Sequence, residues 1–272
     1  MDSAIMLGMD DRSRFLAAYD EQLRTNAETQ SAVAVRVLGP VWLVTFAGGR
    51  GFVTYQDLGG ADTEAIGRLV GAALAHYQAD PEITRVEWKT RAHDYAPGLH
   101  QSLLRHGFAA EEPESIMIGA AKRLAVDVPL SDGVRLRQVT EEKDVRAMSA
   151  MSAQAFGDTA AEAEAMANAL LGRLSLADGM ELWVAEADGH IVSAGRLEPV
   201  PGTDFAGIWG GSTLKEWRGR GIYRALTAAR ARSALRMGKT LIHSDSTEYS
   251  RPILERSGFL KVSTTTPYLW RR

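Results

Sequence analysis

Basic residues and glycines gather in one short segment of this 272-residue chain. The run Arg218-Gly219-Arg220-Gly221 follows an apolar stretch and directly precedes a long helical pattern. A helix N-terminus presents unpaired N–H groups and a partial positive charge, and glycine lets an anion approach the backbone closely. Flanking arginines add bidentate contacts to phosphate oxygens. The segment therefore predicts a cradle for a pyrophosphate group.

The order of residues in this segment excludes two known phosphate loops. It has neither the Gly-Lys-Ser/Thr of the Walker loop nor the dinucleotide pattern Gly-x-Gly-x-x-Gly. Between Lys215 and Lys239 the basic residues face a single acidic residue, Glu216, although the formal net charge of the chain is −3. That concentration indicates an anionic partner; a solvated helix face is the alternative. Without a flanking basic surface, nucleic acid is not the expected partner.

Further candidate groups lie on either side of the basic helix. Gly210 and Gly211 fit a bulge or a splayed strand end, with ordinary strand irregularity as the alternative. His243 and Asp245 share one face of the next strand, at the end where such sheets bind ligands. Histidine titrates near neutrality, so His243 is a candidate proton relay, unless its role is structural. Asp245 is a second candidate base.

The elements that position these groups follow from hydrophobic periodicity. The order in the second half, β-α-α-β-β-β-α-β-α-β-β, predicts a mixed sheet with helices on its faces. The Asp188-Gly189 pair predicts a two-residue hairpin turn. The expected strands are 134–139, 180–187, 191–199, 205–214, 240–244, 259–265 and 268–271, and the expected helices are 141–156, 160–174, 221–237 and 251–256.

A weak internal repeat suggests two related domains. Leu103-x-x-x-Gly107-Phe108 matches Leu254-x-x-x-Gly258-Phe259, and each follows a helix, a strand and a short helix. In the first half we expect strands at 33–38, 42–46, 85–90 and 115–119, and helices at 61–78 and 99–105. The stretch 127–133 is rich in turn-forming residues, which indicates a linker. The predicted domains are therefore 1–126 and 127–272.

At this point the motifs resemble a known family. Arg218-x-x-Gly221-x-Tyr223 is similar to the Arg/Gln-x-x-Gly-x-Gly/Ala signature of the GNAT superfamily of N-acetyltransferases, with Tyr223 at a position that is usually small. Ile253-Leu254-x-x-x-Gly258-Phe259 resembles the second motif, Leu-Tyr-x-x-x-Gly-Phe. The resemblance covers roughly residues 133–272. It implies an α/β (α+β) fold, a mixed and mostly antiparallel sheet flanked by helices, in two tandem copies of which the first is degenerate.

The resemblance also implies a bound co-substrate, acetyl-CoA. The end of the strand before the loop would direct backbone N–H groups at the thioester carbonyl, where they stabilise an oxyanion. Thr247 stands where the family has a pantetheine-contacting Asn. The implied binding residues are Gly211, Ser212, Thr213, Arg218, Gly219, Arg220, Gly221, Ile222, Tyr223, Arg224 and Thr247.

The usual acid of the family cannot be transferred, because Leu254 replaces its tyrosine. Ser250 lies one turn before Leu254 and is a candidate acid, with helix capping as the alternative role. Tyr268 is another candidate hydroxyl, although a buried tyrosine more often only packs.

The expected function is therefore acetyl-CoA-dependent N-acetylation by direct attack of an amine on the thioester. The chain has no cysteine, so an acyl-cysteine intermediate is excluded. The expected partner is a small-molecule amine acceptor, with an aminoglycoside-type antibiotic as one candidate. The alternatives are acetylation of proteins or peptides, and a non-catalytic coenzyme A-binding regulatory module.

Residue types and spacing also bear on metal sites, membrane spans and cellular location. The six histidines form no paired metal-ligand spacing, so no metal site is expected. No apolar stretch approaches the roughly 20 residues that a membrane span needs. No basic segment followed by an apolar core opens the chain, so we expect a cytoplasmic protein. The sequence leaves the oligomeric state undetermined.

Overall fold

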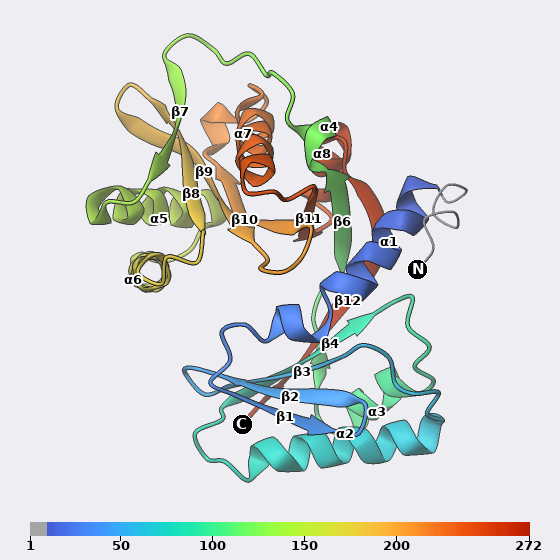
Figure 1. The fold of residues 1–272 in the computed structure, drawn as a ribbon. Coiled ribbons are helices and arrows are strands. Elements are labelled where there is room, and N and C mark those ends of the chain that lie inside the picture. The colour runs from blue at the N-terminus through green and yellow to red at the C-terminus, as the bar shows by residue number, and fades with distance from the viewer. Residues whose placement is uncertain (1–9) are drawn as a thin grey trace. The chain divides into compact units, whose positions relative to one another are not determined.

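A computed structural model describes residues 10–272. The chain forms two compact units (Figure 1). Unit 1 contains residues up to 117 together with 245–252 and 261–272, and unit 2 contains 118–244 and 253–260. Within residues 10–272, no helix is both long and apolar enough to cross a membrane.

Unit 1 is a sheet with the strand order β1-β2-β3-β4-β12. Strands β1, β2 and β3 form an antiparallel meander, β3 pairs parallel with β4, and β12 pairs antiparallel with β4. Its elements are α1 (Asp11–Gln22), η2 (Thr25–Glu28), β1 (Ala34–Leu38), β2 (Val41–Phe46), β3 (Arg50–Tyr55), α2 (Thr63–Gln78), β4 (Arg85–Arg91), α3 (Leu99–Arg105), β5 (Ala109–Ala110) and β12 (Leu260–Arg271). Strand β6 (Glu114–Ala120) contributes residues to both units.

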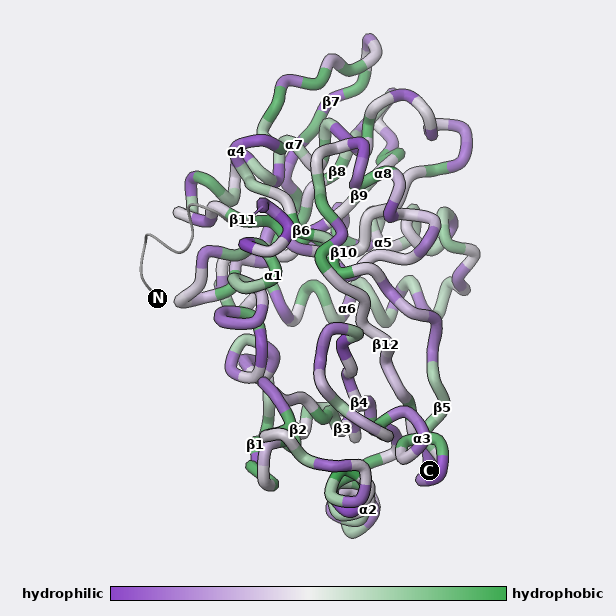
Figure 2. The backbone as a smooth tube through the Cα atoms, turned by 90° about the vertical axis from the view of Figure 1, so that its right-hand side faces the viewer, coloured by the Kyte–Doolittle hydropathy of each residue, from purple (hydrophilic) through white to green (hydrophobic). Residues whose placement is uncertain are grey.

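Helix α2 covers the core of unit 1 and is seen nearly end-on in Figure 2. It starts at Asp62, whose carboxylate accepts a hydrogen bond from the Ala65 N–H at 2.8 Å. Ile66, Val70 and Tyr77 recur at helical spacing and are buried against the strands. Each fully buried apolar side chain of this size contributes roughly 1.5–3 kcal/mol to folding. The predicted helix 61–78 is therefore confirmed.

Unit 2 repeats the same arrangement, with the strand order β11-β10-β9-β8-β7. Strands β8, β9 and β10 form an antiparallel meander, and β10 pairs parallel with β11. Its elements are α4 (Ala121–Leu124), β7 (Val134–Val139), α5 (Glu142–Phe156), α6 (Ala160–Leu174), β8 (Glu181–Ala187), β9 (His190–Pro199), β10 (Phe205–Thr213), η3 (Lys215–Trp217), α7 (Ile222–Arg236), β11 (Leu241–Ser246) and α8 (Arg251–Ser257).

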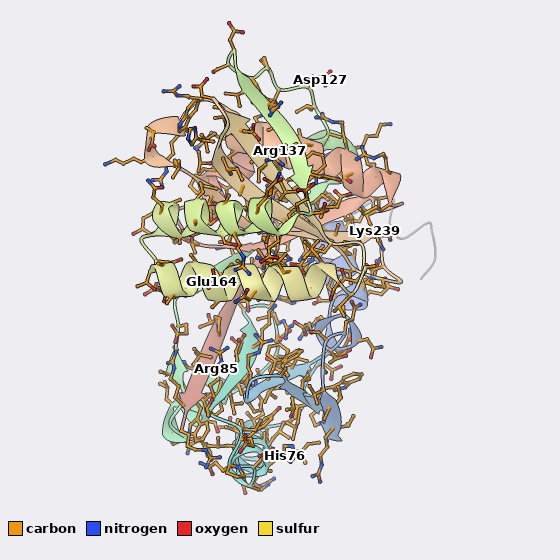
Figure 3. The ribbon with its side chains drawn as sticks, turned by 90° about the vertical axis from the view of Figure 1, so that its left-hand side faces the viewer. His76, Arg85, Asp127, Arg137, Glu164 and Lys239 are labelled. Atoms are coloured by element: carbon orange, nitrogen blue, oxygen red, sulfur yellow. The ribbon has the colours of Figure 1, made fainter. Side chains whose placement is uncertain are left out.

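Two layers of helices cover the sheet of unit 2. Leu182 and Val184 pack with α5 and α6, whereas Ala185 and Ala187 pack with α7, as strand alternation requires. Helices α5 and α6 lie side by side (Figure 3), and Arg146 of α5 bonds Glu164 of α6 at 2.6 Å. The predicted turn at Asp188-Gly189 is confirmed, since both residues have positive φ, at 50° and 77°.

The short helices α3 and α8 end in the same way. In unit 1 the Phe108 N–H donates to the Leu103 carbonyl at 3.0 Å, and Gly107 has φ +83°. In unit 2 the Phe259 N–H donates to the Leu254 carbonyl at 3.1 Å, and Gly258 has φ +107°. Each is a helix C-cap that requires a residue in the left-handed region. The repeat in the sequence thus corresponds to a repeat in structure.

The C-terminal residues differ from the sequence expectation. One strand, β12, runs through Pro267, where we expected two strands separated at that proline. Pro267 has no N–H to donate to a neighbouring strand. Its carbonyl still accepts a hydrogen bond from the Glu111 N–H at 2.9 Å. The compact units also assign residues 261–272 to unit 1. The division into domains 1–126 and 127–272 stays a prediction, because contacts between segments do not test common descent.

Candidate active site

The pairing of β10 with β11 is short, although both strands continue. Among the described residues it joins Phe205, Ala206 and Gly207 to Leu241, Ile242 and His243. Strand β10 then runs on to Thr213. The two parallel strands therefore part after Gly207, at the carboxyl end where open sheets bind ligands. Backbone groups on this edge of β10 are available to a ligand.

The predicted irregularity in β10 is present beside this opening. Its register with β9 shifts between Trp209 and Ser212, and Gly210 has φ +60°. This is a β-bulge, which bends the strand and turns its N–H groups away from the ordinary ladder. Ser193 fixes the strand end by donating to the Ser212 carbonyl at 2.7 Å. The Ser152 hydroxyl lies 2.9 Å from that of Ser212 and links the strand to α5.

The basic loop that follows β10 leads directly into α7. Gly219 and Gly221 have φ of +77° and +75°, and Gly221 is the N-cap. No side chain among the described residues caps this helix start. An added Cβ at Gly219 would meet no atom within 4 Å, so the space above the loop is open. The first N–H groups of α7, on Ile222, Tyr223 and Arg224, are therefore accessible to an anion.

The three arginines of the loop and of the helix start that follows it have different environments. The Arg218 guanidinium donates to the Thr213 carbonyl at 3.0 Å and to the Ala155 carbonyl at 3.3 Å, so it braces the loop. Arg220 stacks on the ring of Trp217, with 4.7 Å from the guanidinium carbon to the ring centroid. Arg224 lies exposed in the first turn of α7. Arg220 and Arg224 are therefore the candidates for contact with a phosphate group.

Tyr223, the departure from the small residue of the motif, has a clear packing partner. An added Cβ on Gly211 would lie 2.4 Å from the Tyr223 ring, so the ring covers that glycine. The Arg230 guanidinium carbon also lies near this ring, 5.7 Å from its centroid. Arg230 is fully buried, and burial lowers the pKa of its guanidinium. A glycine in β10 thus compensates for a large residue in α7.

The structure divides the remaining candidate catalytic residues between the units. His243 belongs to unit 2, and its ring lies edge-on to those of Trp209 and Phe205, at 5.3 and 5.8 Å. Asp245 belongs to unit 1, where its carboxylate forms an ion pair with Lys89 at 3.1 Å. Only His243 thus shares the unit of the basic loop.

The hydroxyl candidates also belong to unit 1. The Ser250 hydroxyl lies 2.7 Å from that of Ser246 and 3.1 Å from that of Thr247. Tyr268 is buried in the core of unit 1, and its hydroxyl lies 2.5 Å from His100 Nδ1. Burial raises the pKa of the Tyr268 hydroxyl. The basic loop belongs to unit 2, whereas Ser250, Thr247 and Tyr268 all belong to unit 1. Their roles stay predictions.

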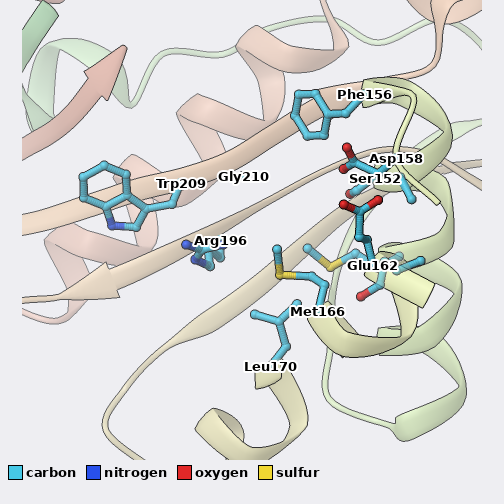
Figure 4. Close-up of a pocket in the computed structure, with 13 residues that line it drawn as sticks. Ser152, Phe156, Asp158, Glu162, Met166, Leu170, Arg196, Trp209 and Gly210 are labelled. Carbon is cyan, nitrogen blue, oxygen red and sulfur yellow. The ribbon is translucent and has the colours of Figure 1, made fainter. Parts of the chain in front are cut away.

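A pocket that the sequence did not indicate lies wholly in unit 2 (Figure 4). Its volume is about 170 Å³. It is bounded by α5 and α6 on one side and by Arg196, Trp209 and Gly210 of the sheet on the other. The pocket therefore adjoins the bulge of β10. The polar turn Gly157-Asp158-Thr159 between two helices was a sequence signal for a polar edge of this pocket. Periodicity alone does not show that this turn lies near β10.

The equivalent position in unit 1 lacks an open helix start. Asp62 caps α2 with its own carboxylate, which accepts the hydrogen bond of the Ala65 N–H and opposes the approach of an anion. This agrees with a first copy that has no coenzyme site.

Comparison with known proteins identifies the fold. Residues 140–267 match the sequence profile of the acetyltransferase (GNAT) domain. A GCN5-related N-acetyltransferase from Kribbella flavida aligns over 96% of each chain, with 16% identity and a TM-score of 0.67. A tandem GNAT protein from the clavulanic acid biosynthesis pathway aligns over 87% of this chain and 79% of its own, with 15% identity and a TM-score of 0.60.

A third structure, a GCN5-related N-acetyltransferase from Sphaerobacter thermophilus, aligns over 85% of this chain and 76% of its own, with 18% identity and a TM-score of 0.57. No curated protein matches the chain. At these identities the solved structures establish the fold. The predicted resemblance and the predicted fold class are thereby confirmed.

Proposed function

Because residues 140–267 carry an acetyltransferase (GNAT) domain, we propose that the protein is an acetyl-CoA-dependent N-acetyltransferase of small amines. One observation carries the proposal. The opening between β10 and β11 lies beside the bulge of β10, and the same strand leads to the uncapped start of α7. The proposed acyl site and the proposed phosphate site would thus lie on one continuous segment of unit 2.

The residues present fit the pyrophosphate of acetyl-CoA. Gly219 leaves the approach to the backbone open, and the start of α7 offers N–H groups and positive dipole charge. Arg220 and Arg224 would add charge-assisted hydrogen bonds. Arg218 would act indirectly, since its guanidinium holds the strand end and α5 together.

The chain's own groups account for the chemistry of acyl transfer. The bulge at Gly210 and Gly211 would direct backbone N–H groups at the carbonyl, where they stabilise developing negative charge. The new C–N bond forms as the C–S bond breaks, the amine loses a proton and the thiolate gains one. Ser193 and Ser152 hold the strand end, so the donors are fixed before reaction.

We assign the proton-accepting role to His243, directly or through water. It is the titratable candidate in unit 2, at the point where the strands part. Asp245 is less suited, because its carboxylate belongs to unit 1 and is engaged in the ion pair with Lys89. Ser250 and Tyr268 remain weaker candidates for the acid, since they belong to unit 1.

A matched pair of variants tests the cradle. Gly221→Ala adds a methyl group at the N-cap of α7, within the proposed cradle, whereas Gly238→Ala adds one at the far end of α7 at nearly the same φ, +76°. We expect isothermal titration to give at least tenfold weaker acetyl-CoA binding for the first variant and unchanged binding for the second. Equal affinity of both variants would contradict the proposed cradle.

Thiol release from acetyl-CoA over a panel of amines tests the reaction itself. Turnover on small amines supports the proposal. Binding of acetyl-CoA without turnover on any amine would favour a coenzyme A-responsive regulatory module, and turnover on peptides alone would favour a protein acetyltransferase.

A further inference from the structure

The pocket in unit 2 has a buried apolar floor. Met148, Ala153 and Leu170 are all less than a tenth exposed and come from α5 and α6. Phe156 and Met166 stand at its edge and are 61% and 47% exposed. Large apolar side chains left this exposed around a concave site indicate a surface that a ligand covers. The pocket therefore suits an apolar body of small size.

One polar atom in this floor has no partner. The Ser149 hydroxyl is buried, with its residue 2% exposed, and makes no hydrogen bond within the described residues. Ser149 also lines the pocket. Buried hydroxyl groups are nearly always hydrogen-bonded, and leaving one unpaired is unfavourable. A ligand atom that bonds this hydroxyl would remove the deficit.

The rim of the pocket carries negative charge. Asp158 and Glu162 line it at the start of α6, on the side opposite the sheet wall formed by Trp209 and Gly210 (Figure 4). Glu162 accepts hydrogen bonds from the Thr159 N–H and hydroxyl, both at 2.8 Å, and these bonds lower the pKa of its carboxyl group. An ionised rim raises the local concentration of cations. Arg196, the cation in the wall, is neutralised by Glu198 at 2.5 Å.

We propose that the acceptor is a monoamine with a compact apolar body that carries one hydrogen-bonding group. The apolar body fills the floor, Ser149 bonds its polar group, and Asp158 with Glu162 attracts its ammonium form. The proposal rests on the proposed acetyltransferase function, and it deepens that function by naming the acceptor class. A polycationic, polyhydroxylated amine lacks the apolar body that this floor requires.

Three matched probes separate the contributions. Tyramine has an amine and a phenol, phenethylamine lacks the phenol, and tyrosol replaces the amine by an alcohol. By isothermal titration we expect tyramine to bind the protein about tenfold more tightly than either analogue. In Ser149→Ala the preference for tyramine over phenethylamine should fall to less than twofold. In Asp158→Asn the preference for tyramine over tyrosol should fall, whereas Glu164→Gln, on α6 but not lining the pocket, should leave it unchanged.

The outcomes distinguish the two proposals. Failure of acetyl-CoA to bind overturns the proposed function, while the affinities of the three probes still measure the pocket. Acetyl-CoA binding with an unchanged tyramine preference in Ser149→Ala overturns the acceptor assignment alone. Tighter binding of kanamycin than of tyramine would also overturn it, in favour of an aminoglycoside-type acceptor. Ser149→Ala places a good helix former inside α5, and a thermal melt confirms that the variant is folded.

Discussion

Two departures from the family motif, Tyr223 and Leu254, have different structural consequences. Leu254 is buried beneath the C-cap of α8, so the position that usually holds an acid is part of the core. Tyr223 covers Gly211, and the two residues fit each other in size. From the sequence, only the departures are visible. Their partners come from distant positions, which residue types alone do not reveal.

The Gly211–Tyr223 contact predicts a size-dependent coupling. Gly211→Ala should destabilise the protein by about 1–3 kcal/mol, because its Cβ would overlap the Tyr223 ring. In a Tyr223→Ala background, the same change should cost less than about 0.5 kcal/mol, since the ring is gone. Urea unfolding of the four proteins measures the coupling. Equal costs in the two backgrounds would show that the ring does not cover Gly211.

A second residue-scale prediction concerns the ionic cluster of unit 1. Arg91 donates to the Glu28 carboxylate at 2.5 Å, and Lys89 lies 3.3 Å from it. Burial alone would raise the pKa of Glu28, but the two cations lower it to about 2. The pKa is thus depressed in the folded state, so the stabilisation is present above the unfolded pKa of about 4.5 and is lost as the pH falls towards 2.

Glu28→Gln should therefore make the fall in stability between pH 4.5 and 2 less steep. It should also destabilise the protein at neutral pH by about 3–5 kcal/mol, because buried cations lose a partner. Urea unfolding at several pH values checks both effects. Glu64→Gln is the control, since Glu64 pairs with Arg68 in an exposed position. An unchanged pH slope in Glu28→Gln would refute the role of this carboxylate.

At the scale of elements, local patterns predicted most helices and strands. The stripe of α2, the Asp188-Gly189 turn and the loop before α7 all follow from neighbouring residues. Helix α1, at Asp11–Gln22, was not predicted, because its apolar residues form only a weak stripe. The pocket was missed for another reason. Its walls come from α5, α6, β9 and β10, whose proximity results from tertiary packing.

The repeated helix C-caps predict matched effects of substitution. Gly107→Ala and Gly258→Ala should each destabilise the protein by about 1 kcal/mol, because alanine is strained at φ of +83° and +107°. Space is available at both sites, so backbone strain is the main cost. Gly172→Ala, inside α6 with nothing within 4 Å of the added Cβ, should instead be neutral or stabilising. Thermal unfolding of the three variants tests this ordering, and a loss only at Gly172 would contradict it.

For the whole molecule, the main finding is that the C-terminal strand completes unit 1. Strand β12 pairs with β4 over seven residue pairs, from Thr265–Arg91 to Arg271–Arg85. Tyr268 and Trp270 also pack in or against the core of unit 1. Residue patterns predicted two strands at this end of the chain, 259–265 and 268–271, but not which sheet they join. Strand pairing is decided by contacts at long sequence separation, which periodicity does not contain.

This arrangement predicts that the first half is incomplete by itself. A fragment of residues 1–126 lacks β12, so the edge of β4 and the core around Trp88 lose their cover. We expect it to show no cooperative unfolding in circular dichroism. Mixing it with a fragment of residues 127–272 should restore a cooperative transition, because the missing strand is supplied in trans. A fragment of residues 127–259 is the matched control and should restore nothing, since it ends before β12. Cooperative unfolding of 1–126 alone would instead mean that the meander and α2 suffice for a stable core, and β12 would then be an addition to a domain already complete.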